Sequence, residues 1–400
     1  MKFVHVEDFI HPEAGYQVNL LSKLQVQQGH EVFVVTSELD KVPDSLTAFF
    51  GKDNIQERDE KFYQLTGVKI IRVPLLGFYS GRAIFHSKLF KVVNSLNPDV
   101  VFIHGNDTLT GMRFIRKAKK LSFPLVLDSH MLEMASTNRF HNAFTFFYKR
   151  WITPRILKNN MPLIRLVDSD YIEKHLGIPL EKSSLLSFGT DTSFFNKDEA
   201  AKHKFRQKHN ISHDNFVALY AGKLDVAKGG KFLATSLQEE LKTNTGQRIT
   251  FIIVGNTAGD YGKEVDELLK TSKNKILRFP TQTYLNLREF YQAADLAIYP
   301  KQCSMSFFEA QSCELPVIFE DNEINTERAQ FGNAITFKGG DVEDFRTKIL
   351  QCAEMNKETY TKMKVAARKF ICDNYDFVPI AQQFSDIMMR EAETFSVTKR

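Results

Sequence analysis

The 400-residue chain has no unbroken apolar run approaching the roughly 18 to 20 residues that a membrane-spanning helix requires. It also has no fixed-period repeat and no low-complexity segment, which argues against solenoids and disordered tails. Charged residues fall within the first eight positions, and no apolar core of a signal peptide follows Lys2. We therefore expect a cytoplasmic protein.

Cysteine is scarce, and the few cysteines show no C-x-x-C pairing. All 4 lie in the last quarter of the chain. In a reducing compartment we expect them to be free thiols, not disulfide partners or zinc ligands. They are Cys303, Cys313, Cys352 and Cys372.

The charge is only mildly unbalanced. Lys and Arg number 53 and Asp and Glu 48, for a formal net charge of +5. This excess suits an anionic partner such as a phosphate or a membrane surface. The sequence has no arginine-rich arm and no RNA-binding aromatic motif, so we expect no nucleic-acid partner.

Short apolar segments alternate with longer amphipathic ones along most of the chain, in two successive series. Short, unbroken apolar segments suit strands of a parallel sheet that is covered by helices on both faces. The pattern predicts an α/β protein with two doubly wound, Rossmann-like domains facing a central cleft. The predicted strands are 2–6, 31–37, 68–73, 100–104, 125–130 and 163–169, then 216–222, 250–256, 275–280, 296–300 and 316–320.

We place the domains at residues 1–188 and 189–375. A turn-rich stretch at 187–198 separates the two series. The tail 376–400 has apolar residues at helical spacing, and we expect it to pack back on the first domain.

Two lysines follow a predicted strand in the segment YAGKLDVAKGG, residues 220–230. Lys223 and Lys228 lie five residues apart in a loop at the carboxyl end of that strand. Fixed cations there can stabilise the negative charge of a leaving diphosphate without a metal ion. Taken alone, two solvated surface lysines are the commoner interpretation.

A second informative segment is LAIYPKQCSMSFFEAQSCELPVIFE, residues 296–320. A strand leads into a loop and then a helix that we expect to begin near Ser304, with Ser304 or Ser306 as its cap. Free N–H groups at such a helix start attract anions. Glu309 follows about one turn later and can accept hydrogen bonds from a ribose diol, although a solvated helix glutamate is an equal alternative.

The order of these motifs resembles the family 4 glycosyltransferases. It runs from strand-Gly-Lys-x4-Lys-Gly through VGN (254–256) and Tyr-x-x-Ala-Asp (291–295) to the 300–317 segment. The first half agrees, with its glycine loop and helix at 11–37, DSH at 128–130, VDSDYIEKHL at 167–176 and SFGTDTSFF at 187–195. The resemblance covers nearly the whole chain. It implies a GT-B fold and metal-independent, retaining transfer from a UDP or GDP sugar, with no further cofactor.

The resemblance also assigns roles to single residues. It implies that Lys223 and Lys228 bind the donor diphosphate and that Glu309 holds the ribose. His130 matches a histidine near the transferred sugar. The other implied donor-site positions are Gly15, Gly222, Asn256, Gln302, Cys303, Ser304 and Met305.

Two positions depart from the family pattern. Lys301 stands where the first glutamate of Glu-x7-Glu is expected, so the identity of the sugar does not follow from the resemblance. Glu314 replaces a glycine at a helix end, where another residue is tolerated at modest cost. Both changes are also compatible with a weakened enzyme.

Three further features have competing interpretations. Asp168-Ser169-Asp170 spells the Asp-x-Asp of metal-dependent transferases, but we favour a helix cap. His104 ends a strand, where a histidine is more often structural. Aromatic and basic residues interleave in 139–160, which suits either an anionic membrane surface or packing of the aromatics into the core.

The resemblance implies a glycan or lipid-linked acceptor in polysaccharide, capsule or lipopolysaccharide synthesis, at the inner face of the membrane if 139–160 contacts it. Two alternatives share the architecture. One is a nucleotide-sugar epimerase, and the other is a degenerate sugar-nucleotide-binding partner of another transferase.

Overall fold

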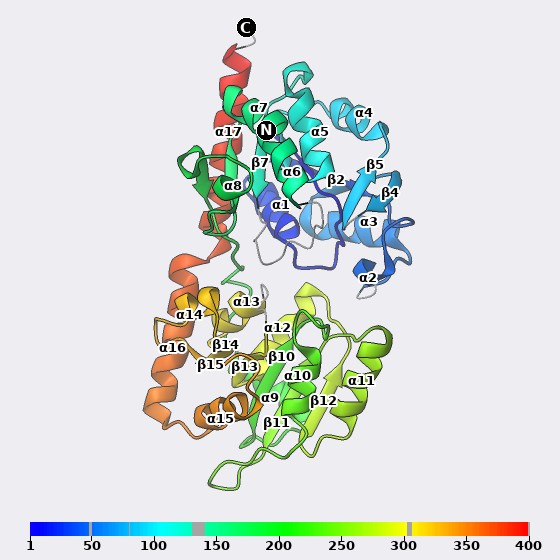
Figure 1. The fold of residues 1–400 in the computed structure, drawn as a ribbon. Coiled ribbons are helices and arrows are strands. Elements are labelled where there is room, and N and C mark those ends of the chain that lie inside the picture. Colours follow the sequence, from blue (N-terminus) through cyan, green and yellow to red (C-terminus); the bar gives the residue numbers. More distant parts are fainter. Residues whose placement is uncertain (48–49, 80, 130–140, 302–305, 399–400) are drawn as a thin grey trace. The chain divides into compact units, whose positions relative to one another are not determined.

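The structure is a computed structural model that describes residues 1–47, 50–79, 81–129, 141–301 and 306–398. The chain divides into two compact units (Figure 1). The first is Met1–Phe188 together with Val378–Arg400, and the second is Gly189–Phe377. Each unit is built on a parallel sheet flanked by helices, which confirms the predicted α/β fold with two Rossmann-like domains.

The first unit contains a seven-stranded parallel sheet in the order β3-β2-β1-β6-β7-β8-β9. The order reverses beside β1, so the loops after β1 and β6 lie at a topological switch point, where open α/β sheets bind ligands. The strands are β1 (Lys2–Val6), β2 (Glu31–Ser37), β3 (Lys69–Val73), β6 (Val100–Ile103), β7 (Leu125–Ser129), β8 (Leu163–Arg165) and β9 (Ser183–Leu185). A separate antiparallel hairpin, β4 (Leu75–Tyr79) and β5 (Arg82–Phe85), was not predicted.

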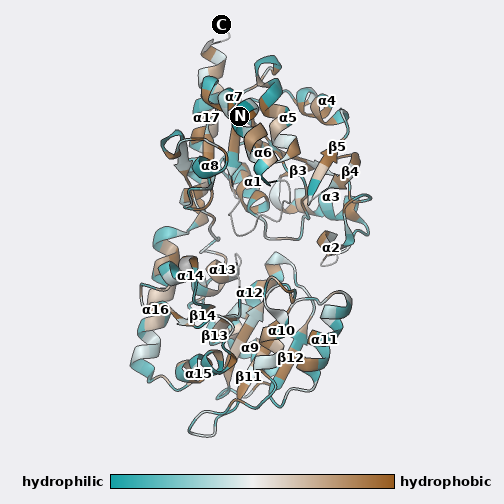
Figure 2. Cartoon of the chain, viewed as in Figure 1, coloured by the Kyte–Doolittle hydropathy of each residue, from teal (hydrophilic) through white to brown (hydrophobic). Residues whose placement is uncertain are grey.

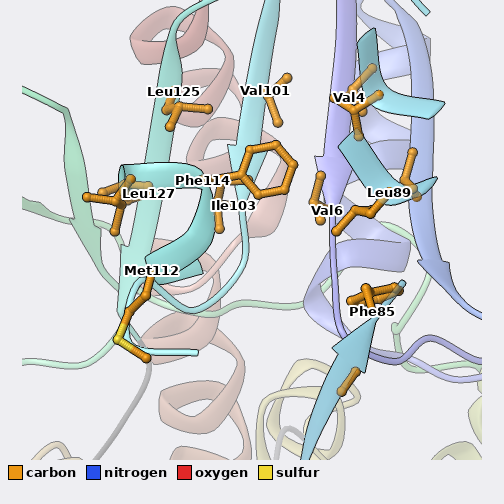
Figure 3. Close-up of a cluster of buried hydrophobic side chains, with 14 of the residues drawn as sticks. Val4, Val6, Phe85, Leu89, Val101, Ile103, Met112, Phe114, Leu125 and Leu127 are labelled. Atoms are coloured by element: carbon orange, nitrogen blue, oxygen red, sulfur yellow. The ribbon is translucent and has the colours of Figure 1, made fainter. Parts of the chain in front are cut away.

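Helices connect these strands. They are α1 (Gln17–Gln27), α2 (Asp44–Thr47), α3 (Ile55–Thr66), α4 (Lys88–Ser95), α5 (Leu109–Lys117), η1 (Ala118–Lys120), α6 (His141–Phe147), η3 (Tyr148–Ile152), α7 (Thr153–Lys158), α8 (Tyr171–Lys174) and η4 (Leu180–Lys182). The helices α4, α5, η3 and α7 bury apolar residues in one core with the strands. Figure 3 shows part of that core, with Phe114 from α5 and Leu89 from α4 among strand residues such as Val6 and Val101.

The last helix, α17 (Phe377–Thr398), contributes to the first unit. The Phe384 ring lies 5.9 Å from the Phe102 ring, and Met388 Sδ accepts a hydrogen bond from Gln25 Nε2 at 3.3 Å. Ser385 Oγ donates to Gln28 Oε1 at 2.5 Å. Residues of α17 therefore contact both the sheet and α1.

The second unit contains a six-stranded parallel sheet in the order β12-β11-β10-β13-β14-β15. Its switch point lies between β10 and β13. The strands are β10 (Phe216–Ala221), β11 (Ile249–Val254), β12 (Lys275–Phe279), β13 (Leu296–Tyr299), β14 (Val317–Glu320) and β15 (Ala334–Phe337). The helices are α9 (Glu199–Lys208), α10 (Gly230–Ser236), α11 (Gly259–Lys270), α12 (Tyr284–Ala293), α13 (Ser306–Ser312), α14 (Glu323–Arg328), α15 (Val342–Ala353) and α16 (Lys357–Asn374).

The strand predictions were largely correct. Each predicted segment contains a strand, and Figure 2 shows that the strands of both sheets are mainly hydrophobic. The edge strands β9 and β15 were not predicted. Among the described residues, Cys313, Cys352 and Cys372 are free thiols as expected, whereas Cys303 lies outside them.

Candidate functional site

Lys223 follows directly after β10 and Gly222, at the carboxyl end of a central strand of the second unit. The Tyr220 hydroxyl donates to the Lys223 carbonyl oxygen at 2.5 Å, which holds the backbone of the turn. Burial lowers the pKa of Lys223, and the nearby Asp225 carboxylate opposes that shift. Because burial penalises the charged amine, an anion bound beside it would stabilise the protonated form.

Lys228 lies on the same loop, just before α10. Its backbone N–H donates to Asp225 Oδ1 at 2.9 Å, so Asp225 organises the turn between the two lysines. Gly229 follows with φ +74°, a left-handed conformation that glycine adopts without strain. A Cβ on Gly229 would lie 3.1 Å from Lys301 Cβ. The structure thus brings the lysine loop against the segment after β13, which joins two motifs about 75 residues apart in sequence.

Gly222 and Asn256 lie at neighbouring strand ends. The Gly222 N–H donates to the Val254 carbonyl at 3.0 Å, and a Cβ on Gly255 would lie 1.9 Å from the Gly222 carbonyl oxygen. Only glycine fits at 255. Asn256 N donates to Thr281 Oγ1 at 3.1 Å, and Thr281 N donates to Asn256 Oδ1 at 3.0 Å. Asn256 therefore ties the β11 and β12 loops together, and its role toward a donor stays a prediction.

Glu309 lies on α13 and is buried. The Tyr291 hydroxyl of α12 donates to Glu309 Oε2 at 2.8 Å. Burial raises the pKa of Glu309 to about 7, with the Tyr291 hydrogen bond opposing the shift. The alternative of a solvated helix glutamate is therefore wrong. A contact with a ribose stays a prediction, and the sequence analysis did not identify Tyr291 as a partner.

Glu314 occupies the glycine position of the family pattern. Its φ is +63°, so the backbone takes the left-handed conformation for which glycine is favoured. Its carboxylate lies 3.6 Å from Lys197 Nζ. This confirms that a non-glycine residue is tolerated at this helix end, where an ion pair accompanies the strained backbone.

In the first unit, the strand ends hold a buried polar network that was not predicted. His104 Nδ1 lies 3.0 Å from Asp128 Oδ2, and His104 Nε2 lies 3.0 Å from His5 Nδ1. Asp128 Oδ1 also accepts the Gly105 N–H at 2.6 Å. The structural interpretation of His104 is confirmed to this extent, since its ring is buried and hydrogen-bonded. The signal in the sequence was the placement of all three residues in or directly after strands.

The remaining predicted positions divide into described and undescribed residues. Gly15 lies two residues before α1, in the loop after β1. The described part of helix α13 begins at Ser306, and the predicted start near Ser304 lies outside the described residues. Five predicted site residues lie outside the described residues: His130, Gln302, Cys303, Ser304 and Met305.

The Asp-x-Asp sequence occupies a helix start in the first unit. Asp168 pairs with Arg165 at 3.1 Å. Asp170 occupies the N-cap position of α8, as predicted. Its side chain makes no capping hydrogen bond, so that part of the prediction is wrong. Within the described parts of the chain, no group of three or more His, Cys, Asp or Glu is arranged to hold a metal ion.

Comparisons with known proteins agree with this arrangement. Residues 201–370 match the family model described as glycosyl transferases group 1. Residues 14–164 match the model described as glycosyltransferase family 4. The two matches together cover about four fifths of the chain.

Curated relatives include two D-inositol 3-phosphate glycosyltransferases. That of Acidothermus cellulolyticus is 30% identical over 141 residues, which are 32% of this chain and 31% of the relative. That of Catenulispora acidiphila is 24% identical over 239 residues, which are 55% of this chain and 56% of the relative. The chain thus spans about half or less of the relatives that it matches.

Solved structures show the same fold. A glycosyltransferase from Rickettsia africae superposes with a TM-score of 0.72 at 13% identity, covering 98% of both chains. HepE from Anabaena, solved with UDP and glucose, gives 0.70 at 18% identity, covering 98% of this chain and 100% of that one. The UDP-GlcNAc 2-epimerase from Neisseria meningitidis gives 0.57 at 16% identity, covering 98% and 100%.

The two family matches establish the family, and the structural matches establish the fold. The lysine loop follows the strand β10 and Glu309 lies on the helix α13, as the motifs predicted. This chain belongs to the family 4 glycosyltransferases and has their GT-B fold.

Proposed function

We propose that the protein transfers a sugar from a nucleotide diphosphate sugar to a glycan or lipid-linked acceptor, with retention of configuration. The observation that carries the proposal is the loop of Lys223 and Lys228 at the end of β10, packed through Gly229 against Lys301. Family membership supports the reaction class. The UDP bound to HepE supports UDP as the first donor base to test, with GDP as the second.

The lysine loop suits the departure of a nucleoside diphosphate. As the bond between the anomeric carbon and the β-phosphate oxygen breaks, negative charge grows on the phosphate. Cations held in place before the reaction stabilise that charge most where water is excluded. The Lys223 side chain is exposed, so a phosphate can reach it, and desolvation of its amine lowers its pKa.

The acceptor then forms the new glycosidic bond on the face from which the diphosphate leaves. In this route the acceptor hydroxyl gives its proton to the departing phosphate oxygen, so no separate carboxylate base is required. The Glu309 carboxyl would hold the ribose and His130 would lie near the transferred sugar. No metal ion or further cofactor takes part in the proposed step.

Lys301 affects which donor sugar the proposed site would accept. A glutamate at this family position reads sugar hydroxyls, whereas a lysine favours a neutral or anionic group. Burial raises the pKa of Glu320 and the Lys301 charge opposes that shift, so the Lys301 amine lies near the end of β14. We therefore include uronic acid and phosphorylated sugars among the donors to test.

Turnover in a variant tests the lysine loop. Lys228→Ala should lower the rate of sugar transfer by about a hundredfold or more, as loss of one charge-stabilising donor does in other enzymes. Lys231→Ala is the matched control, because this lysine lies three residues further along and its side chain is half exposed. Wild-type turnover in Lys228→Ala would remove the role proposed for this residue.

The epimerase alternative is favoured by one observation, the fold shared with the Neisseria enzyme. It requires a changed free nucleotide sugar in the absence of any acceptor. The degenerate-partner alternative is favoured by Lys301 and by the strained backbone at Glu314. It requires nucleotide binding without transfer from any donor. NMR of the reaction products, with and without an acceptor, separates these outcomes.

We further propose that the acceptor belongs to polysaccharide, capsule or lipopolysaccharide assembly, and that the enzyme acts in the cytoplasm at the inner face of the membrane. Among the described residues, no helix is long and apolar enough to cross a bilayer.

A further inference from the structure

Two segments of the first unit carry basic residues and no acidic ones. Residues 108–127 include α5 and η1, and residues 141–167 include α6, η3 and α7. Together they hold ten of the 53 Lys and Arg residues and none of the 48 Asp and Glu residues. The rest of the chain therefore has 43 basic residues against 48 acidic ones. The net positive charge of the protein comes entirely from these two segments.

The fold places the two segments side by side. Helix α5 packs against both η3 and α7. Both segments bury their apolar residues in the same core, including Phe114 and Ile115 of α5, Ile152 of η3 and Ile156 of α7. We call the exposed side chains of these two packed segments the basic face. Its exposed cations are Arg116, Lys117, Lys119, Lys120, Lys149, Arg150 and Lys158.

Aromatic side chains project from the same layer. Tyr148 of η3 is completely buried, which satisfies the packing interpretation for that ring. Phe146, Phe147 and Trp151 are 72%, 39% and 49% exposed, so the core accounts for only part of the aromatic content.

The exposed rings and the cations are neighbours. Phe147 and Trp151 lie four residues apart along the helix, where side chains share one side. The Arg150 guanidinium lies 5.2 Å from the Trp151 ring.

We propose that the basic face binds the surface of an anionic lipid bilayer, with Phe146, Phe147 and Trp151 entering the headgroup region. Aromatic rings at the surface combined with flanking Lys and Arg are the composition of an element that lies in the membrane interface. Neither segment itself contributes a carboxylate that would repel lipid phosphates. This interaction does not depend on the proposed catalytic roles.

A soluble polyanion is the competing occupant, because phosphate groups would also satisfy the cations. It would leave the three exposed rings in water unless bases stacked on them. A bilayer would contact both the cations and the exposed rings. We therefore propose the bilayer as the partner.

Vesicle flotation of the full chain tests the proposal. We expect binding to vesicles containing about 30% phosphatidylglycerol and little binding to pure phosphatidylcholine. Raising the salt from about 0.05 M to about 0.5 M should weaken binding, because the charges are exposed. Phe146→Ser with Trp151→Ser, and separately Lys119→Glu with Lys120→Glu, should each weaken it by about tenfold or more.

A matched variant controls for net charge. Lys204→Glu with Lys208→Glu makes the same charge change on exposed lysines of α9, in the second unit, and should leave vesicle binding unchanged. Failure of the wild-type chain to bind anionic vesicles would overturn the proposal, as would equal losses in the α9 control. Two results together would assign the basic face to a polyanion instead. The aromatic variant would bind vesicles as the wild type does, and inorganic polyphosphate would displace the two proteins from vesicles equally well. All substituted side chains are exposed, and the salt dependence of the wild type tests the charge contribution if a variant fails to fold.

Discussion

His104 Nδ1 lies 3.0 Å from Asp128 Oδ2, and its Nε2 lies 3.0 Å from His5 Nδ1. Gln25 orients the far end of this buried network, because its Nε2 donates to Met388 Sδ and its Oε1 lies 2.6 Å from His5 Nε2. An amide oxygen only accepts, so His5 donates from Nε2. Burial lowers the pKa of His5 to about 3, so this ring is neutral. Asp128 lies at the other end, where its Oδ1 also accepts the Gly105 N–H at 2.6 Å.

Removing the Asp128 charge should therefore destabilise the first unit strongly. In Asp128→Asn, the buried His104 ring and the Gly105 N–H would lose a charged hydrogen-bond acceptor. A hydrogen bond to a charged group typically contributes about 1.5–3 kcal/mol. Chemical denaturation measures the loss, and Asp40→Asn, an exposed carboxylate in the same unit, should change the free energy of unfolding by less than about 0.5 kcal/mol. Similar losses in the free energy of unfolding for the two variants would contradict a stabilising role for the Asp128 carboxylate.

Glu309 should make stability fall as the pH rises. Its pKa is raised to about 7 from 4.5, so between these values the folded chain keeps a proton that the unfolded chain releases. The free energy of unfolding therefore decreases as the pH rises through this window, and the effect is complete above it. Wild type should lose roughly 2–3 kcal/mol relative to Glu309→Gln between about pH 5 and pH 8. If the free energy of unfolding changed with pH in the same way in both proteins, the raised pKa of Glu309 would be refuted.

Glu314→Gly should stabilise the second unit. A residue with a Cβ at φ +63° costs about 1–2 kcal/mol, and glycine removes that cost. The substitution also loses the partly exposed ion pair with Lys197, which contributes less. Glu314→Ala is the control, because it loses the ion pair and keeps the Cβ, so it should not stabilise. A gain in Tm with alanine equal to that with glycine would show that the carboxylate, not the backbone, carries the strain.

Gly255→Ala should disrupt the strand ends that carry the lysine loop. The new Cβ would meet the Gly222 carbonyl at 1.9 Å, a distance that only backbone movement relieves. We expect a loss of several kcal/mol and weaker nucleotide binding, since overpacking alone costs about 1–3 kcal/mol. Gly246→Ala separates the steric clash from the cost of a positive φ. Gly246 also has a positive φ, +79°, but nothing lies within 4 Å of its added Cβ. Equal losses in the two variants would mean that the clash has no effect.

The sequence predicted the parts of the site that depend on local pattern. Lys223 and Lys228 follow an apolar strand, and the Gly229 turn has the φ that its residue type favours. The edge strands escaped prediction because β15 is mostly half-exposed and β9 begins with two serines, so neither forms an apolar run.

Contacts between distant segments were beyond the sequence pattern. His5, His104 and Asp128 come from three strands whose neighbours are set by the order of the sheet, not by spacing. Glu309 was identified, but its burial against Tyr291 depends on how α12 and α13 pack. One half of the basic face, in 139–160, was visible in the sequence, whereas the half from α5 and η1 is joined to it only by the fold.

Calorimetric titration with UDP, GDP, ADP and CDP, with and without EDTA, tests the central claim most directly. It is performed on wild type, Lys228→Ala and Lys231→Ala. We expect the wild type to bind one diphosphate selectively, with binding unchanged by EDTA, retained in Lys231→Ala and lost in Lys228→Ala. Absence of binding to all four nucleotides, or binding that requires a metal ion, would contradict it.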